Sequence, residues 1–164
     1  LADIESIDGV PIEGDRRSDV GSPGAQEMAS SRDPTLLEWG IAFQPPAGWV
    51  RQLDSGNDKV AFVRRNPTGI LIIGSKDLPY EASFELGVKM MPGRKERVTF
   101  AGAPGYVSVH EENTPGGERV KVRSYLLYRQ KRFYTITYMS GVGGGFEANL
   151  GEADRALATF EFVD

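Results

Sequence analysis

Two tyrosines and an arginine on one face of a predicted hairpin form the group of side chains best suited to binding chemistry in this chain. If Gln130-Lys131 is a two-residue hairpin loop, the flanking strands pair so that Arg123 faces Tyr138, and Tyr125 lies two residues along the same face. A guanidinium beside phenol rings makes cation–π contacts and can grip an anion with two N–H groups. Arg123, Tyr125 and Tyr138 are therefore candidate ligand-binding residues, with cross-strand packing as the structural alternative.

Catalytic and metal-binding groups are scarce in the rest of the sequence. Cysteine is absent and His110 is the single histidine, which excludes thiolate nucleophiles, disulfides and sites with two imidazoles. His110-Glu111-Glu112 begins like a zinc-protease motif, but Thr114 stands where the second histidine is required. No Gly-x-Ser-x-Gly nucleophile elbow occurs. We expect no catalytic residue, no metal site and no cofactor.

The elements that position the hairpin are mostly strands. Runs rich in β-branched and aromatic residues, bounded by Gly, Pro, Asn and Asp, predict strands over 39–43, 59–65, 70–74, 97–101, 106–111, 118–129, 132–140 and 161–163. Apolar residues at spacings of three and four predict two helices, one with the stripe Phe84, Val88 and Met91 and one with Phe146, Leu150, Ala153, Leu157 and Phe160.

The long hairpin also predicts the fold class. One of its faces carries Leu127, Tyr134 and Ile136, and the other carries Leu126 and Phe133. Neither face is purely polar, unlike a sheet with one side in water. We therefore expect an α+β fold with a single antiparallel sheet flanked by helices on both faces, an α/β/α sandwich.

Composition and charge predict the domain organisation. Residues 1–35 are rich in Gly, Pro, Ser and acids, which predicts a flexible acidic leader or linker, and residues 36–164 fit a single α/β domain. The leader is interpreted as a tether, with a partner-binding arm as the alternative. The net charge of −4 does not favour nucleic-acid binding, and the longest apolar runs are too short for a transmembrane helix.

Three segments from Trp39 onward resemble the PsbP-like superfamily, which includes small bacterial lipoproteins and Ran-binding Mog-type proteins. Phe43-Gln44-Pro45-Pro46-Ala47-Gly48-Trp49 is similar to its aromatic-x-x-Pro-x-Gly-Trp opening, Val120–Ser140 to its late hairpin, and Ala158-Thr159-Phe160-Glu161-Phe162 to its closing segment. The resemblance implies an antiparallel sheet flanked by helices. It also implies an accessory or binding subunit at membranes that acts without catalysis, and it assigns no site residue.

These observations favour a non-catalytic, exported accessory or binding domain that acts through a protein partner. We expect a periplasmic or cell-envelope location, close to a membrane through an anchor upstream of Leu1. One alternative is a small-ligand or anion-binding module that uses the Arg123, Tyr125 and Tyr138 side chains. A further alternative is a hydrolase with a carboxylate or tyrosine site.

Overall fold

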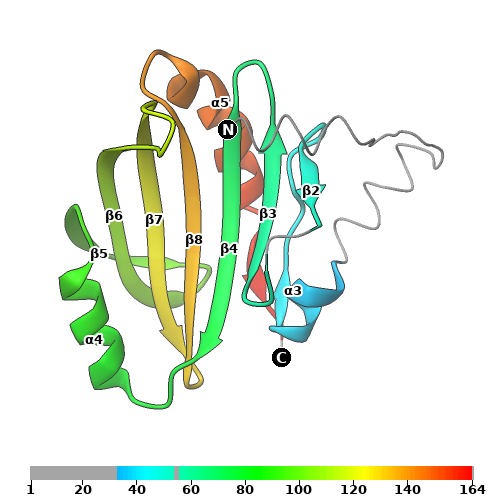
Figure 1. Ribbon diagram of the computed structural model, residues 1–164. Coiled ribbons are helices and arrows are strands. Elements are labelled where there is room, and N and C mark those ends of the chain that lie inside the picture. Colours follow the sequence, from blue (N-terminus) through cyan, green and yellow to red (C-terminus); the bar gives the residue numbers. More distant parts are fainter. Residues whose placement is uncertain (1–32, 54–55, 164) are drawn as a thin grey trace.

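One large antiparallel sheet dominates the computed structural model, which describes residues 33–53 and 56–163 (Figure 1). Its strand order is β2-β3-β4-β8-β7-β6-β5. These strands are β2 (Val50–Gln52), β3 (Lys59–Arg64), β4 (Gly69–Asp77), β5 (Arg94–Phe100), β6 (Ala103–Asn113), β7 (Arg119–Arg129) and β8 (Arg132–Gly141). A two-stranded sheet pairs β1 (Ile41–Ala42) with β9 (Glu161–Phe162). The described helices are α3 (Pro34–Glu38), α4 (Glu81–Met90) and α5 (Gly145–Leu157).

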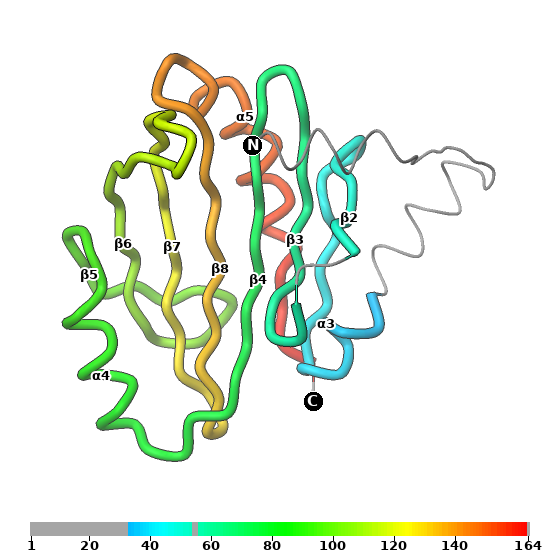
Figure 2. Tube along the Cα trace, in the orientation of Figure 1, coloured from blue at the N-terminus to red at the C-terminus, as the bar shows by residue number. Residues whose placement is uncertain are grey.

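The register of the long hairpin confirms the prediction from the sequence. Gln130 and Lys131 both have positive φ, at 52° and 64°, as a tight two-residue turn between twisted strands requires. Arg129 therefore pairs with Arg132, and the ladder continues down to Arg123 opposite Tyr138. Figure 2 shows β7 and β8 running side by side along this ladder.

Strand β6 begins earlier than the sequence suggested. The sequence pattern predicts strands over 97–101 and 106–111, but Ala103 already pairs with Phe100 in β5. The turn is shorter because Ala101 and Gly102 both adopt positive φ, at 52° and 81°, and reverse the chain within two residues.

The main core lies on the face of the sheet that α5 covers. Alternate residues of β8 point to this face, and Tyr134, Ile136 and Tyr138 are all buried there. The Tyr138 ring lies 4.7 Å from the ring of Phe146 in the first turn of α5. The predicted stripe of α5 thus packs on the face that carries the candidate Tyr138.

Helix α4 covers one end of the opposite face. Phe84 packs against Tyr106, Tyr128 and Phe133, with ring centroids 5.5–6.1 Å apart. Phe133 and Tyr138 are an odd number of residues apart in β8, so α4 and α5 lie on opposite faces.

The expected single sheet flanked by helices on both faces is wrong. A second sheet, β1 with β9, occupies part of the α5 face, and the three described helices are short. The Phe162 ring of β9 lies 4.9 Å from Tyr134 and 5.3 Å from Phe160. Because such large rings bury much apolar area from short extended segments, this part of the core needs no helix.

The start of the described chain contains a helix that the strand pattern hid. Asp33 caps α3, because its Oδ1 accepts the N–H groups of Thr35 at 2.9 Å and Leu36 at 3.2 Å, and Pro34 follows at the first helical position. Residues 1–32 of the predicted leader lie outside the described residues. Within the part that is described, none of the helices has the length and apolar character to cross a membrane.

Candidate functional site

Helix α5 is held by polar contacts on both of its flanks. On one side, Glu152 Oε1 accepts the indole N–H of Trp49 at 2.9 Å and lies 2.8 Å from Nη1 of Arg64. On the other side, Asp154 Oδ1 accepts Nη2 of Arg123 at 2.6 Å. Two candidate sites follow, one around Arg123 and one in a groove beyond Glu152.

The structure brings the three residues predicted from the sequence together. The Arg123 guanidinium carbon lies 5.5 Å from the ring centroid of Tyr125 and 5.9 Å from that of Tyr138. Its Nη2 is bound to Asp154, whereas its buried Nε has no partner among the residues described. The cation is therefore packed between two rings and held by one carboxylate.

Tyr138 is the buried member of this cluster. Its side chain is 1% exposed, and its hydroxyl donates to the Phe146 carbonyl oxygen at 2.6 Å. Burial raises the pKa of Tyr138 to about 12. The neighbouring Tyr125 is only half-buried and stacks on Phe100 with centroids 4.5 Å apart. A ligand here meets Arg123 and Tyr125 directly, and competes with Asp154 for the guanidinium.

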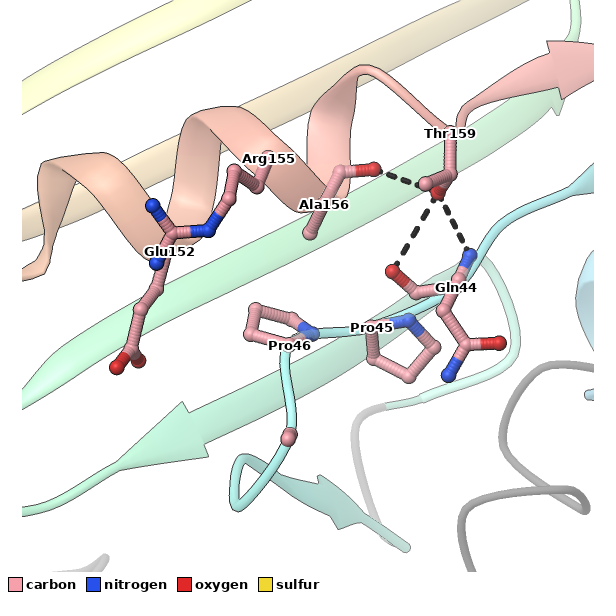
Figure 3. A pocket seen from close by; sticks show the side chains of 8 residues that line it. Gln44, Pro45, Pro46, Glu152, Arg155, Ala156 and Thr159 are labelled. Carbon is pink, nitrogen blue, oxygen red and sulfur yellow. Dashed lines mark hydrogen bonds between the residues drawn. The ribbon is translucent and has the colours of Figure 1, made fainter.

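A groove runs along the other flank of α5, against the segment from Gln44 to Ala47 (Figure 3). Its volume is about 270 Å³. It is lined by Gln44, Pro45, Pro46, Ala47, Glu152, Arg155, Ala156 and Thr159. The two prolines lack backbone N–H groups, so this segment leaves the sheet after β1 and forms a stiff wall.

Thr159 joins the two walls of the groove. Its hydroxyl accepts the backbone N–H of Gln44 at 2.9 Å and donates to the Ala156 carbonyl at 2.6 Å (Figure 3). The contact spans 115 residues of sequence. It fixes the Pro45–Pro46 wall relative to the end of α5.

The groove carries one acid and one base, Glu152 and Arg155, which interact electrostatically but differ in their hydrogen bonds. Glu152 already receives two donors, and the Trp49 hydrogen bond, followed by the Arg64 contact, holds the pKa of its carboxyl below the usual value. Arg155, one turn further along α5, makes no hydrogen bond or ion pair with the described residues. Figure 3 shows both side chains on the flank of α5 that faces the prolines. The groove can therefore pair Arg155 with an incoming anion.

Sequence reasoning did not find this groove. In the sequence, Pro45-Pro46 stands out only as part of the 43–49 motif, and α5 only through its apolar stripe. The spacing of Glu152, Arg155 and Thr159, three and four residues apart, was an available signal for one polar flank of the helix. Nothing local indicated that residues 44–47 face that flank.

The single histidine, His110, pairs with a carboxylate on its own strand. His110 Nε2 lies 2.8 Å from Glu112 Oε1, two residues along β6. Across residues 33–53 and 56–163, no group of three or more His, Cys, Asp and Glu side chains is arranged to hold a metal ion.

The fold and these sites define an α+β domain in which α5 and a small sheet pack on one face of a seven-stranded antiparallel sheet. No protein-family model matches the sequence, and no curated protein matches it.

Several solved structures are similar, including these two. One is a crystal structure from Bacteroides thetaiotaomicron VPI-5482, with a TM-score of 0.58 and 15% identity over 76% of this chain. The present chain covers 46% of that one, so it spans less than half its length. The other is LpqN, involved in cell envelope biogenesis of Mycobacterium tuberculosis, with a TM-score of 0.53, 12% identity, and coverage of 76% of this chain and 83% of LpqN. At these identities the similarities show a shared fold.

Proposed function

We propose that this chain is a non-catalytic, PsbP-like binding domain of the cell envelope, which recognises an acidic extended segment of a protein partner in the groove beside α5. The observation that carries the proposal is the Arg155 guanidinium, which makes no hydrogen bond or ion pair with any described residue, in a groove that two prolines and Thr159 hold in shape. The proposal assigns recognition to this groove, and it assigns no reaction to the domain.

The size and shape of the groove favour a peptide segment over a small molecule. At about 270 Å³ it falls below the roughly 300–1,000 Å³ of ordinary small-molecule pockets. Its Pro45–Pro46 wall has little conformational freedom to lose, so binding orders few protein groups. An extended segment lying along such a wall contacts it over several residues.

The charge of the groove favours an acidic segment. Arg64 is paired with Glu152, and Arg123 is paired with Asp154, whereas Arg155 remains available. An Asp, Glu or terminal carboxylate placed beside Arg155 forms a charge-assisted hydrogen bond, with Arg offering a bidentate geometry. The adjacent Glu152 repels a second negative charge, so one acidic group per segment fits best.

A selection experiment tests this recognition. A phage-displayed random 12-residue peptide library is selected on the wild-type domain, and the enriched peptides are titrated against Arg155→Ala. We expect peptides enriched in Asp or Glu whose affinity falls about tenfold in Arg155→Ala, a loss of about 1.4 kcal/mol. Arg94→Ala, an exposed arginine of edge strand β5, is the matched control and should bind as the wild type does. Equal affinity of all three proteins contradicts the proposal.

The proposed location has its own test. The fold shared with LpqN and the predicted acidic leader support an envelope location. An antibody against the domain, used on fractionated source cells, should find the protein in the envelope or periplasmic fraction. Protein confined to the cytoplasmic fraction contradicts this location and leaves the peptide result standing.

Anion binding at Arg123 is the second candidate, because the buried Nε of Arg123 has no partner among the described residues. Inorganic phosphate and acetate are the probes. Either should raise the melting temperature of the wild type and leave that of Arg123→Ala unchanged. Equal shifts in both proteins argue against this site.

A further inference from the structure

Helix α4 carries apolar side chains on two opposite sides. Phe84 and Val88 face the sheet and are buried. Leu86 and Met90, one turn apart on the outer side, are 60% and 77% exposed, and Tyr80 just before the helix is 71% exposed. A surface helix normally presents polar residues on its outer side, so this outer apolar face needs a separate explanation.

The charges around this outer face are mostly positive. Its bases are Lys89 on the helix and Lys76, Lys95 and Arg97 beside it, and its acids are Glu81 and Glu85, with the exposed Asp77 next to Lys76 in β4. Contacts place three of these bases beside the helix: Lys76 and Arg97 lie over the Phe133 and Tyr106 rings that pack against Phe84, and Lys95 donates to the Met91 carbonyl.

The two acids, Glu81 and Glu85, contribute little negative charge to the outer face of α4. Glu85 accepts the Tyr106 hydroxyl at 2.8 Å and is turned toward β6. On the 100° rotation per helical residue, Glu81, Glu85 and Lys89 follow one another along one flank of α4, and Lys89 lies between Glu85 and the outer Leu86. The base of α4 and the bases that β4 and β5 place beside it therefore flank the apolar strip.

We propose that the outer face of α4 docks on a membrane surface that contains anionic lipids. Leu86, Met90 and Tyr80 enter the boundary between headgroups and acyl chains, and the surrounding bases pair with lipid phosphates. Charge complementarity selects this occupant, because two copies meeting through this face would bring their bases together. Figure 1 places α4 at one end of the sheet, well apart from α5, so the groove stays open when α4 is docked. The proposal does not depend on peptide recognition in the groove.

The absence of cysteine allows a direct test. Met90→Cys provides a unique position for an environment-sensitive fluorophore on the otherwise full chain. Leu53→Cys, at a leucine that is 91% exposed at the end of β2, is the matched control. Vesicles of phosphatidylglycerol and phosphatidylcholine should raise and blue-shift the emission at position 90 and not at position 53. Pure phosphatidylcholine vesicles should produce little change.

Charge-reversal variants complete the test by vesicle flotation. We expect Leu86→Glu with Met90→Glu to lower binding at least tenfold, Lys89→Glu to lower it more than fivefold, and Leu53→Glu to leave it unchanged. Thermal unfolding by circular dichroism should show that all variants fold, because the substituted side chains are exposed. Three results overturn the proposal: no binding to anionic vesicles, full binding by the Leu86/Met90 variant, or light scattering that shows a dimer dependent on these residues without vesicle binding.

Discussion

Gly105 in β6 offers a sharp test of the sheet register that positions the Arg123 cluster. The pairing of Gly105 with Leu127 sets Val107 opposite Tyr125 and Val109 opposite Arg123. A Cβ at position 105 would lie 2.2 Å from the Leu126 carbonyl oxygen and 2.7 Å from Leu127 Cδ2. The oxygen belongs to the backbone of a central strand, so it cannot move without disturbing the ladder.

The cost of Gly105→Ala follows from this overlap. Inserting a methyl group into a filled site costs typically about 1–3 kcal/mol, and a fixed backbone contact places this site at about 2–3 kcal/mol. Gly87→Ala in α4 is the same chemical change in open space, since a Cβ there meets nothing within 4 Å. It should stabilise the protein by about 1 kcal/mol, because alanine is favoured over glycine inside helices.

Urea denaturation followed by circular dichroism measures both changes. Gly105→Ala should lower the midpoint at an unchanged slope, and a thermal scan should show a Tm roughly 4–8 °C lower for about 2 kcal/mol. Gly87→Ala should shift both quantities the opposite way. A Gly105→Ala protein within about 0.5 kcal/mol of the wild type would refute the β6–β7 register described above.

Three further predictions concern the side chains around α5. Burial raises the pKa of Tyr138 from 10.0 to about 12 in the folded protein, so the unfolded chain loses this phenol proton first as pH rises. The free energy of unfolding should therefore fall between about pH 10 and pH 12. Tyr138→Phe should reduce that fall, as measured by urea titrations at several pH values. The fold lowers the pKa of the Glu152 carboxyl, so the stability that this carboxylate contributes is present above the ordinary pKa of 4.5 and is lost as pH falls through the folded-state pKa. Glu152→Gln should therefore flatten the acid side of the curve of unfolding free energy against pH. An unchanged acid side would contradict the Trp49 contact. Asp154→Asn should lower the free energy of unfolding by less than about 1 kcal/mol, because the Asp154 side chain is half exposed. Arg123→Ala should lower it more, because this change also removes packing on the aromatic rings. Equal losses for the two variants in a double-mutant cycle would contradict this division.

Local patterns predicted much of the fold and part of the candidate site. The loop at Gln130-Lys131 set the hairpin register, and that register placed Arg123 opposite Tyr138 as observed. Helical spacing located α4 and α5, because buried residues recur at three and four wherever one face packs. These signals lie within about 20 residues of sequence, and neighbouring residues alone decide them.

The groove beside α5 could not be predicted in the same way. Its walls, the Pro45–Pro46 segment and the flank bearing Arg155, lie more than 100 residues apart, and Thr159 joins them through Gln44. The sequence also does not show which arginines form ion pairs. Arg155 is near Glu152 by helical spacing alone, whereas only the fold brings Arg64, which is 88 residues away in sequence, into an ion pair with Glu152.

The amino-acid sequence by itself determined most of the strands, the two longer helices, the hairpin register and the exclusion of thiol and multi-histidine chemistry, because each depends on residue type and short-range spacing. The tertiary structure alone decided that β1 and β9 pair, that α4 covers one end of a face, and that Glu152 takes its ion pair from Arg64, while Arg155 makes no hydrogen bond or ion pair within residues 33–53 and 56–163. The physical reason is that burial and charge pairing depend on distance in space, and a chain of 164 residues brings together groups that its order keeps far apart.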